Sequence, residues 1–305
     1  MNAVELINVT KRFGTFAAVD NLTLSVPAAT VYGFIGPNGS GKTTTLRMIM
    51  RIIYPNGGTI RVLGEDVIGQ GAASDRVGYL PEERGLYRKM KVRDLIRFHA
   101  ELKSLRHSKG DAQRWLERMG LGDWGDKKID ALSKGMSQKV QFICTVIAKP
   151  ELIILDEPFT GLDPVNASLF IEVIQELRRS GATIILSTHD MSVAERMCDH
   201  LFMIFKGNKV LDGTLEEIQS AYGMDTLRVK IDLNGRQLEA VPGVAGVADF
   251  GRYQELRVEQ GVDTQAVLRH LMDLGKVRHF EHAHPSLHDI FVRIAGPEAK
   301  EAAHA

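Results

Sequence analysis

Residues 36–43 read Gly36-Pro37-Asn38-Gly39-Ser40-Gly41-Lys42-Thr43 and fit the pattern G-x-x-x-x-G-K-[ST] of a phosphate-binding loop. A triphosphate presents oxygens that only accept hydrogen bonds, and glycines let successive backbone N–H groups close around them. A glycine-rich turn that matches by accident is expected in roughly one chain of this size in a hundred. We therefore predict that Lys42 reaches the β- and γ-phosphates and that the Thr43 hydroxyl ligates Mg²⁺.

The sequence on both sides of this loop has the character that the motif requires. Residues 30–35 form an apolar run typical of a buried strand, and Leu46, Met48, Ile49 and Met50 give the following segment a helical pattern. A helix that begins at Lys42 would direct its N-terminus toward the phosphates, and this end of a helix attracts anions. The order strand, loop, helix favours nucleotide binding over an accidental glycine-rich turn.

Two further apolar runs, at 152–155 and 183–186, are typical of strands in a parallel sheet that is covered on both faces. Residues 169–179 between them predict a crossover helix. Asp156 and Glu157 follow the first run directly, and His189 follows the second. Because ligands bind at the carboxyl ends of such strands, these three side chains are expected beside the phosphate loop.

The chemistry of these three residues suits phosphoryl transfer to water. A carboxylate at the end of a buried strand is the usual Mg²⁺ partner of a phosphate loop, which gives Asp156 a metal-binding role. A second carboxylate, Glu157, can polarise the attacking water, and His189 can contact the γ-phosphate. The alternative is a purely structural role, in which Asp-Glu-Pro only ends a strand and His189 only stabilises the fold. The phosphate loop upstream favours the catalytic interpretation.

The pattern along the chain predicts two folded parts of an α/β protein. Residues 4–9, 22–26 and 59–63 indicate an N-terminal antiparallel β part, and residues 88–148 a helical insert. Alternating apolar residues restart at Leu227, so we expect a first domain over 1–222 and a small α+β domain over 223–296. Residues 297–305 are polar and are predicted to be a disordered tail.

Composition limits the class of protein. The chain has 305 residues, 44% hydrophobic and 25% charged residues, a formal net charge of zero and two cysteines. Balanced charge gives no support to nucleic-acid binding, and no run of 18 apolar residues predicts a membrane span. The start of the chain shows no secretory signal, and the cysteines are far apart, so we expect a cytoplasmic protein with free thiols.

A third motif gives the chain a family resemblance. Leu132-Ser133-Lys134-Gly135-Met136 resembles the signature L-S-G-G-Q of the ATP-binding cassette (ABC) family. The phosphate loop, this signature, the segment 152–157, the turn Gly161-Leu162-Asp163 (similar to the family's D-loop) and His189 (similar to its switch histidine) occur in family order. The resemblance covers residues 4–220 and implies a P-loop NTPase cassette with a parallel-sheet core, followed here by the small α+β domain.

The resemblance also implies roles for particular residues. Phe13 matches the aromatic residue that stacks on adenine, and Glu82 stands where most cassettes have the Q-loop glutamine, which contacts Mg²⁺ and the attacking water. Lys134 and Met136 depart from the signature, whereas Ser133 and Gly135 keep the positions that meet the partner's γ-phosphate. The expected nucleotide-binding residues are Phe13, Gly36, Pro37, Asn38, Gly39, Ser40, Gly41, Lys42, Thr43 and Thr44, and the expected Mg²⁺ ligands are Thr43, Asp156 and Glu82.

Three segments narrow the resemblance to the NatA-type (sodium-efflux-like) exporter ATPases: residues 79–87, the signature variant at 132–136 and residues 285–291. Such a protein would bind ATP and Mg²⁺ as a head-to-tail dimer with itself or a paralogous cassette, with no nucleic acid. It would drive a separate multi-span permease from the inner face of the cell membrane, through residues 82–93 and the helical insert. The transported substrate is left open.

Two other functions are possible for a chain with a phosphate loop. A cassette protein that acts on ribosomes usually holds two cassettes joined by a charged linker, and a DNA-repair cassette is interrupted by a long coiled coil. The sequence has neither feature. A purely regulatory nucleotide-binding module is disfavoured because Glu157 is present.

Overall fold

The computed structural model describes residues 1–68, 74–83, 85–103, 109–222, 226–233, 235–259, 261–283 and 285–302. The chain forms two compact units, Met1–Thr214 and Leu215–Ala305. The boundary falls before the predicted one at 222, because the helix α7 (Leu215–Ala221) groups with the C-terminal unit.

The first unit is built on a mixed sheet of six strands in the order β10-β9-β3-β8-β7-β6. The neighbours β9, β3, β8, β7 and β6 run parallel, and β10 is antiparallel to β9. The bounds are β3 Val31–Ile35, β6 Val77–Leu80, β7 Leu152–Asp156, β8 Thr183–Thr188, β9 His200–Phe205 and β10 Asn208–Gly213.

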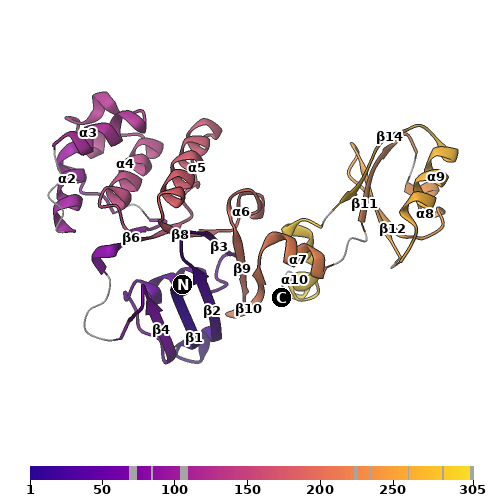
Figure 1. Ribbon diagram of the computed structural model, residues 1–305, viewed down its shortest axis with the longest axis horizontal. Helices are drawn as coiled ribbons and strands as arrows, with labels where there is room; N and C mark the ends of the chain where they lie inside the picture. Colours follow the sequence, from indigo (N-terminus) through magenta and orange to yellow (C-terminus); the bar gives the residue numbers. More distant parts are fainter. Residues whose placement is uncertain are drawn as a thin grey trace. The chain divides into compact units, whose positions relative to one another are not determined.

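A second, antiparallel sheet holds the N-terminal strands in the order β2-β1-β4-β5. Its strands are β1 Asn2–Phe13, β2 Phe16–Pro27, β4 Gly57–Val62 and β5 Glu65–Asp66. The helices of the unit are α1 Lys42–Ile49, α2 Val92–Leu102, α3 Lys109–Arg118, α4 Lys134–Val146, α5 Pro164–Arg179 and α6 Met191–Met197. Helices α2 to α5 lie on one side of the central strands, and β1, β2 and β4 lie on the other (Figure 1).

The continuous apolar runs of the central strands follow from this layered arrangement. In β7, Ile153 and Leu155 pack into the core below the helices, whereas Leu152 and Ile154 pack into the core below the antiparallel sheet. Both faces of the strand are buried, so it has no polar alternation. The α/β cassette architecture with an antiparallel N-terminal part and a helical insert is thereby confirmed.

The helix α2 buries one of two overlapping apolar faces. Phe98 and Leu102 share a possible face with Leu95, but both side chains are exposed. Ile96 and Ala100 are buried in their place. The i, i+3, i+4 pattern allows either face, and the face with Leu95, Ile96 and Ala100 is the one buried in the core shared with α4.

The second unit contains a small α+β fold with the element order β11 Thr226–Ile231, α8 Gly235–Glu239, β12 Val244–Asp249, β13 Gln254–Val258, α9 Thr264–Leu274 and β14 Val277–Ala283. The antiparallel strand order β12-β13-β11-β14 is that of a βαββαβ, ferredoxin-like unit. Its core joins the residues that alternation predicted, including Leu227, Val229 and Ile231 from the central strand.

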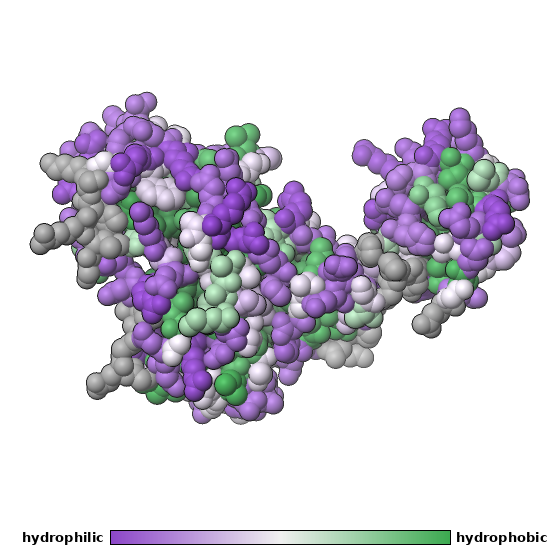
Figure 2. All heavy atoms as spheres, in the orientation of Figure 1, coloured by the Kyte–Doolittle hydropathy of each residue, from purple (hydrophilic) through white to green (hydrophobic). Residues whose placement is uncertain are grey.

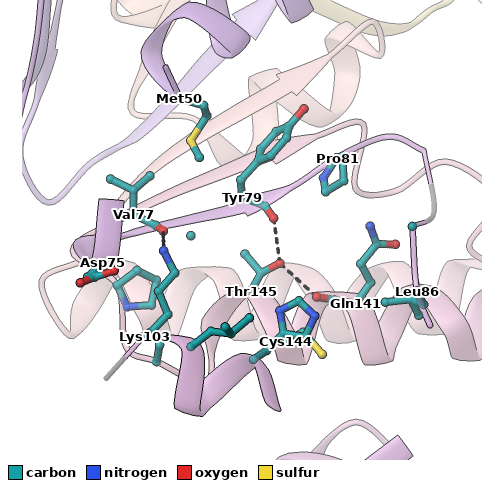
Figure 3. Close-up of a pocket in the computed structure, with 16 residues that line it drawn as sticks. Met50, Asp75, Val77, Tyr79, Pro81, Leu86, Lys103, Gln141, Cys144 and Thr145 are labelled. Atoms are coloured by element: carbon teal, nitrogen blue, oxygen red, sulfur yellow. Dashed lines mark hydrogen bonds between the residues drawn. The ribbon is translucent and has the colours of Figure 1, made fainter. Parts of the chain in front are cut away.

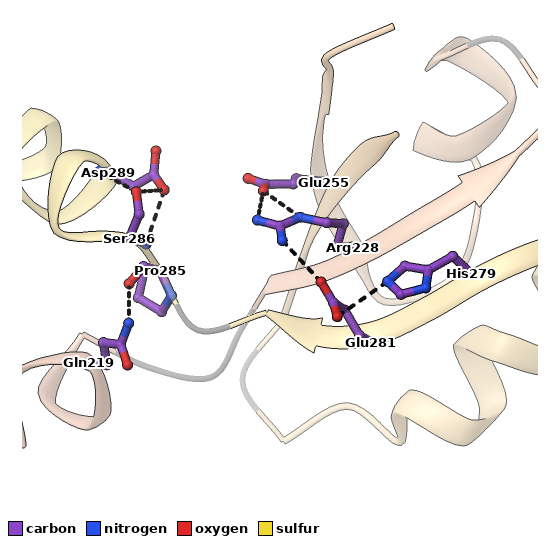
Figure 4. Close-up of polar contacts among 8 residues, drawn as sticks. All are labelled: Gln219, Arg228, Glu255, His279, Glu281, Pro285, Ser286 and Asp289. Atoms are coloured by element: carbon purple, nitrogen blue, oxygen red, sulfur yellow. Dashed lines mark hydrogen bonds and ion pairs between the residues drawn. The ribbon is translucent and has the colours of Figure 1, made fainter. Parts of the chain in front are cut away.

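The opposite face of this small sheet carries a polar network (Figure 4). Arg228 on β11 donates to Glu255 Oε1 at 2.9 Å and to Glu281 Oε1 at 3.0 Å, and its guanidinium lies 4.8 Å from the Tyr253 ring centre. His279 Nε2 lies 3.2 Å from Glu281 Oε2. Cross-strand pairs of opposite charge stabilise a solvent-facing sheet surface, so this network is explained by the fold itself.

The helix α10 (Leu287–Ala302) ends the described chain. Ser286 caps this helix, since its Oγ accepts from Asp289 N at 3.1 Å. The helix includes residues 297–302, for which the sequence analysis expects a disordered tail; residues 303–305 lie outside the described chain.

The molecular surface is largely polar on the face shown in Figure 2. Within the described ranges, no helix is both long enough and apolar enough to span a lipid bilayer.

Candidate nucleotide-binding and hydrolysis site

The phosphate loop follows β3 and leads into α1, as the sequence predicts. Gly36 has a φ of 149°, and a Cβ there would lie 2.3 Å from the Ile204 carbonyl oxygen. Gly41 has a φ of 114°, and a Cβ there would lie 2.5 Å from the Ala18 carbonyl oxygen. Both positions therefore require glycine, on grounds of backbone conformation and of space.

Most predicted nucleotide-binding residues line one pocket of about 410 Å³. The lining comprises Phe13, Phe16, Ala18, Asn38, Gly39, Ser40, Gly41, Lys42, Thr43, Thr44, Glu82, Asp156 and Glu157. Gly36 and Pro37 do not line it directly, but their carbonyl oxygens accept from Lys42 Nζ at 2.6 and 3.1 Å. The tertiary fold thus brings together residues that are more than 140 positions apart in sequence.

Lys42 is a buried ammonium group among carboxylates. Its side chain is 6% exposed, and burial lowers its pKa, an effect that the negative charges of Glu157, Asp156 and Glu82 oppose. With few water molecules around it, this ammonium group gains more from a phosphate oxygen than it would at the surface.

Asp156 ends β7 with its carboxylate beside the phosphate loop. Thr43 Oγ1 donates to Asp156 Oδ2 at 3.2 Å, whereas Asp156 Oδ1 is buried without a hydrogen-bond partner within the described residues. Burial raises the pKa of Asp156, and the hydroxyl groups of Ser187 and Thr43 oppose this shift. A buried carboxylate oxygen without a partner next to a hydroxyl provides the oxygen ligands that Mg²⁺ prefers.

Glu157 and His189 form a hydrogen-bonded pair at the ends of adjacent strands. Glu157 Oε1 accepts from the His189 backbone N–H at 2.9 Å and lies 2.8 Å from His189 Nδ1. Glu157 adopts a φ of 50°, and its backbone N–H donates to the Ser187 carbonyl at 2.9 Å. A left-handed conformation in a residue other than glycine costs free energy and is concentrated at functional sites. His189 itself is not among the pocket-lining residues.

The signature residues lie apart from this pocket. Ser133 is the N-cap of α4, and its Oγ accepts from Met136 N at 3.3 Å. None of residues 133–136 lines the nucleotide pocket. Instead, Lys134 lies against Gly161, where a Cβ would stand 3.3 Å from both Lys134 Cε and Nζ. Asp163 of the same turn caps α5 by accepting from Asn166 N at 3.0 Å.

Sequence reasoning missed two residues of the pocket, Phe16 and Ala18. Phe16 lies directly opposite Phe13 across the two-residue turn between β1 and β2, and these two residues are 61% and 52% exposed. Exposed aromatic rings at a pocket are suited to stacking on a planar base. The available signal was the hairpin itself, because Arg12-Phe13-Gly14-Thr15-Phe16 places two aromatic residues across a tight turn.

The parallel sheet, the phosphate loop that opens α1 and the carboxylates at the end of β7 define a P-loop nucleotide-hydrolysing cassette. Comparisons with known proteins agree with this class. Residues 19–160 match the family model described as ABC transporter, and residues 213–295 match the model described as ATP-binding protein DrrA1-3-like, C-terminal domain.

Several relatives extend over nearly the whole chain. An uncharacterised ABC transporter ATP-binding protein, YhaQ of Bacillus subtilis, is 41% identical over 95% of this chain and 97% of its own length. The Nod factor export ATP-binding protein I of Burkholderia orbicola is 32% identical over 98% of each chain. The daunorubicin/doxorubicin resistance ATP-binding protein DrrA of Streptomyces peucetius is 29% identical over 98% of this chain and 94% of its own.

Among solved structures, an ATP-binding subunit of an ABC transporter is 30% identical, with a TM-score of 0.67 over 72% of this chain and 93% of its own. The chain therefore belongs to the ABC transporter family as an ATP-binding subunit with a DrrA-like C-terminal domain, and it is an ATPase. The alternative of a cassette protein that acts on ribosomes or DNA has no counterpart among these relatives.

Proposed function

We propose that this ATPase works as a head-to-tail dimer that drives a separate permease for export. The observation that supports the dimer is the separation of two motifs within one chain: the phosphate loop lines the nucleotide pocket, and the signature residues 133–136 do not. A second chain, identical or paralogous, would supply its Ser133 and Gly135 to the γ-phosphate. ATP would then hold two cassettes together until hydrolysis releases them.

Within each site, the proposed roles follow from position and chemistry. Glu157 is the general base for the attacking water, and its carboxylate is fixed by His189 N and Nδ1 at 2.9 and 2.8 Å. His189 holds the γ-phosphate. Phe13, with Phe16 beside it, stacks on the adenine, and Asp163 belongs to the turn that faces the partner subunit.

Mg²⁺ is the proposed metal partner of ATP at this site. Asp156, Thr43 and Glu82 would hold it, and two features fit that assignment: the buried Oδ1 of Asp156, which has no hydrogen-bond partner in the described part of the chain, and the neighbouring Thr43 hydroxyl. When bound, the ion neutralises charge on the β- and γ-phosphates. The side chains of the protein itself do the remaining work: Lys42 binds the phosphates, and Glu157 accepts the proton of the water.

A second pocket of the first unit is our candidate for coupling to the permease. It measures about 310 Å³, lies between β6, α2 and α4, and is lined by Pro81, the residue before Glu82 (Figure 3). Its lining is mainly apolar, with Tyr79, Leu86 and Leu102 among its residues. Gln141 on its floor donates to the Glu83 carbonyl at 3.4 Å, and this contact joins the pocket to the segment that carries Glu82. A permease segment seated here would therefore sense movement of Glu82.

Export, rather than import, is supported by the relatives. Two of them are named for export of Nod factors and for resistance to daunorubicin and doxorubicin. These names leave the substrate of the present chain undefined, and the narrower NatA-type assignment remains a prediction. On this proposal the protein lies at the inner face of the cell membrane, held there by its permease.

The proposal is tested by isolating the tagged chain from its native cells in mild detergent. Copurification of a multi-span membrane protein in a fixed ratio is the expected result. Copurification with ribosomes, with no membrane protein present, would refute the transport assignment. The assay is independent of the mutational tests below because it requires no altered residue.

A further inference from the structure

The nucleotide pocket has an excess of negative charge before any nucleotide enters. Among the charged residues that line it, Glu82, Asp156 and Glu157 are acidic and only Lys42 is basic. The triphosphate of ATP brings further negative charge, of which Mg²⁺ neutralises a part. In a partly buried pocket such charges repel one another more strongly than at the surface. A closed site would therefore be stabilised by a second cation from outside the pocket.

Lys134 is a cation that its own surroundings do not explain. It is the first residue of α4, where the positive end of the helix dipole disfavours an ammonium group, and the first turn contains no acidic residue. No hydrogen bond or ion pair of its ammonium group is found within the described residues. A residue that contradicts a local rule without local compensation points to function.

The stem of Lys134 is nevertheless held in place. Gly161, with a φ of 79°, presents a bare backbone against which Lys134 Cε and Nζ rest, each 3.3 Å from where a Cβ would stand. Lys134 directly follows Ser133 in the chain, so it belongs to the surface that the proposed dimer would bring to its partner's nucleotide. It lies outside the pocket of its own chain, so an intrachain pair with Glu82 is not formed.

From these observations we infer that Lys134 of one subunit and Glu82 of the other form a charge pair across each ATP, so that Lys134 is a positioning residue for the nucleotide of its partner. The inference rests on the proposed head-to-tail dimer. Lys134 offsets the excess negative charge that Glu82 adds to the pocket. ATP, with one phosphate more than ADP, gains more from this cation, so the pair also favours ATP over ADP in the closed dimer.

The test uses the full chain carrying Glu157→Gln, a change that is expected to stop hydrolysis. Light scattering at low salt measures the ATP concentration at which half of the protein is dimeric. Lys134→Met keeps the stem and removes the charge, and it should raise that concentration about tenfold. Adding Glu82→Gln to Lys134→Met should bring the concentration back to within about threefold of the starting value. Lys127→Met removes an exposed charge elsewhere and should change nothing.

A mixing experiment separates a pair between chains from a pair within one chain. With Glu157 intact, a heterodimer of a Lys134→Met chain and a Glu82→Gln chain has one site with both native residues and one site with neither. Its ATPase rate should exceed the mean of the two single variants. A rate equal to that mean would overturn the pairing between chains.

Two outcomes of the dimer measurement have different meanings. If the Glu157→Gln chain stays monomeric in saturating ATP, the head-to-tail dimer is wrong, and the charge pair is wrong with it. If the dimer forms, but adding Glu82→Gln to Lys134→Met does not bring the ATP concentration back toward the starting value, the dimer stands and the charge pair is refuted. The side chains of Lys134 and Glu82 are exposed, so each variant is expected to fold, and circular dichroism checks this.

Discussion

Replacing Glu157 by Gln should separate catalysis from folding at this site. The carboxylate makes three contacts: Oε1 with His189 N at 2.9 Å, Oε1 with His189 Nδ1 at 2.8 Å and Oε2 with Thr188 Oγ1 at 3.4 Å. The amide oxygen of glutamine can take over both contacts of Oε1. The Thr188 hydroxyl can rotate and accept from the amide nitrogen.

The two expected magnitudes differ widely. All three contacts have counterparts in the variant, and glutamine meets the same backbone strain at φ 50°, so the free energy of unfolding should change by less than about 1 kcal/mol. An amide cannot accept the proton of the attacking water, and loss of a positioned base costs about 10²–10⁴ in rate. With about 1.36 kcal/mol for each factor of ten, the barrier rises by about 2.7–5.4 kcal/mol.

The assay has three parts on the same protein. Steady-state ATPase activity gives the rate, thermal melting followed by circular dichroism gives the stability, and size-exclusion chromatography with and without ATP reports the trapped dimer. Glu172→Gln, an exposed carboxylate on α5, is the matched control and should resemble the wild type in all three. Turnover within about threefold of wild type in the Glu157→Gln protein would refute the assignment of the base. Unfolding of the variant would instead assign Glu157 a structural role.

Three further predictions concern the metal, Glu82 and the second unit. Asp156→Asn should raise the stability of the nucleotide-free protein by about 1 kcal/mol while abolishing Mg²⁺-dependent hydrolysis. Because burial raises the pKa of Asp156, the wild-type native state loses stability as pH rises toward that raised pKa, so the stability gained by the variant should shrink on acidification in thermal melts. An equal gain at every pH would contradict this reasoning. Glu82→Gln should shift the Mg²⁺ concentration for half-maximal hydrolysis, and Glu82→Ala should reduce transport in vesicles with the permease more than it reduces nucleotide binding; unchanged values in both variants would make Glu82 a surface charge only. A chain that ends at Thr214 should bind ATP with an affinity similar to that of the full chain, measured by calorimetry, because every residue that lines the nucleotide pocket precedes this boundary. A truncated chain that is folded but cannot bind ATP would refute the assignment of nucleotide binding to the first unit alone.

Local features of the chain were predictable wherever one physical rule dominated. The phosphate loop could be predicted because close approach of the backbone to phosphate requires glycine at fixed spacing. Gly36 and Gly41 have no room for a Cβ. The strand β7 could be predicted because a strand that is covered on both faces is apolar throughout and shows no alternation of apolar and polar residues. The core of the second unit followed from the alternation of Leu227, Val229 and Ile231.

Other features depended on partners distant in sequence. The choice of Ile96 over Phe98 as a core residue of α2 was made by packing against another helix, which periodicity alone does not encode. The edge strand β10 exists because it pairs with β9, and its sequence Asn208-Lys209-Val210 carries little strand signal of its own.

The site shows the same division between local and tertiary causes. The residue types and their positions at strand ends identified Lys42, Asp156 and Glu157 from the sequence, because phosphate and Mg²⁺ chemistry accept few alternatives. Only the folded chain showed that Phe16 joins Phe13 at the pocket and that Lys134 rests on Gly161, outside the pocket of its own chain. These relations bring the hairpin of Phe13 and Phe16 to the phosphate loop and place Lys134 against the turn at Gly161, and the free energy that fixes them comes from the packing of the whole unit rather than from any one stretch of sequence.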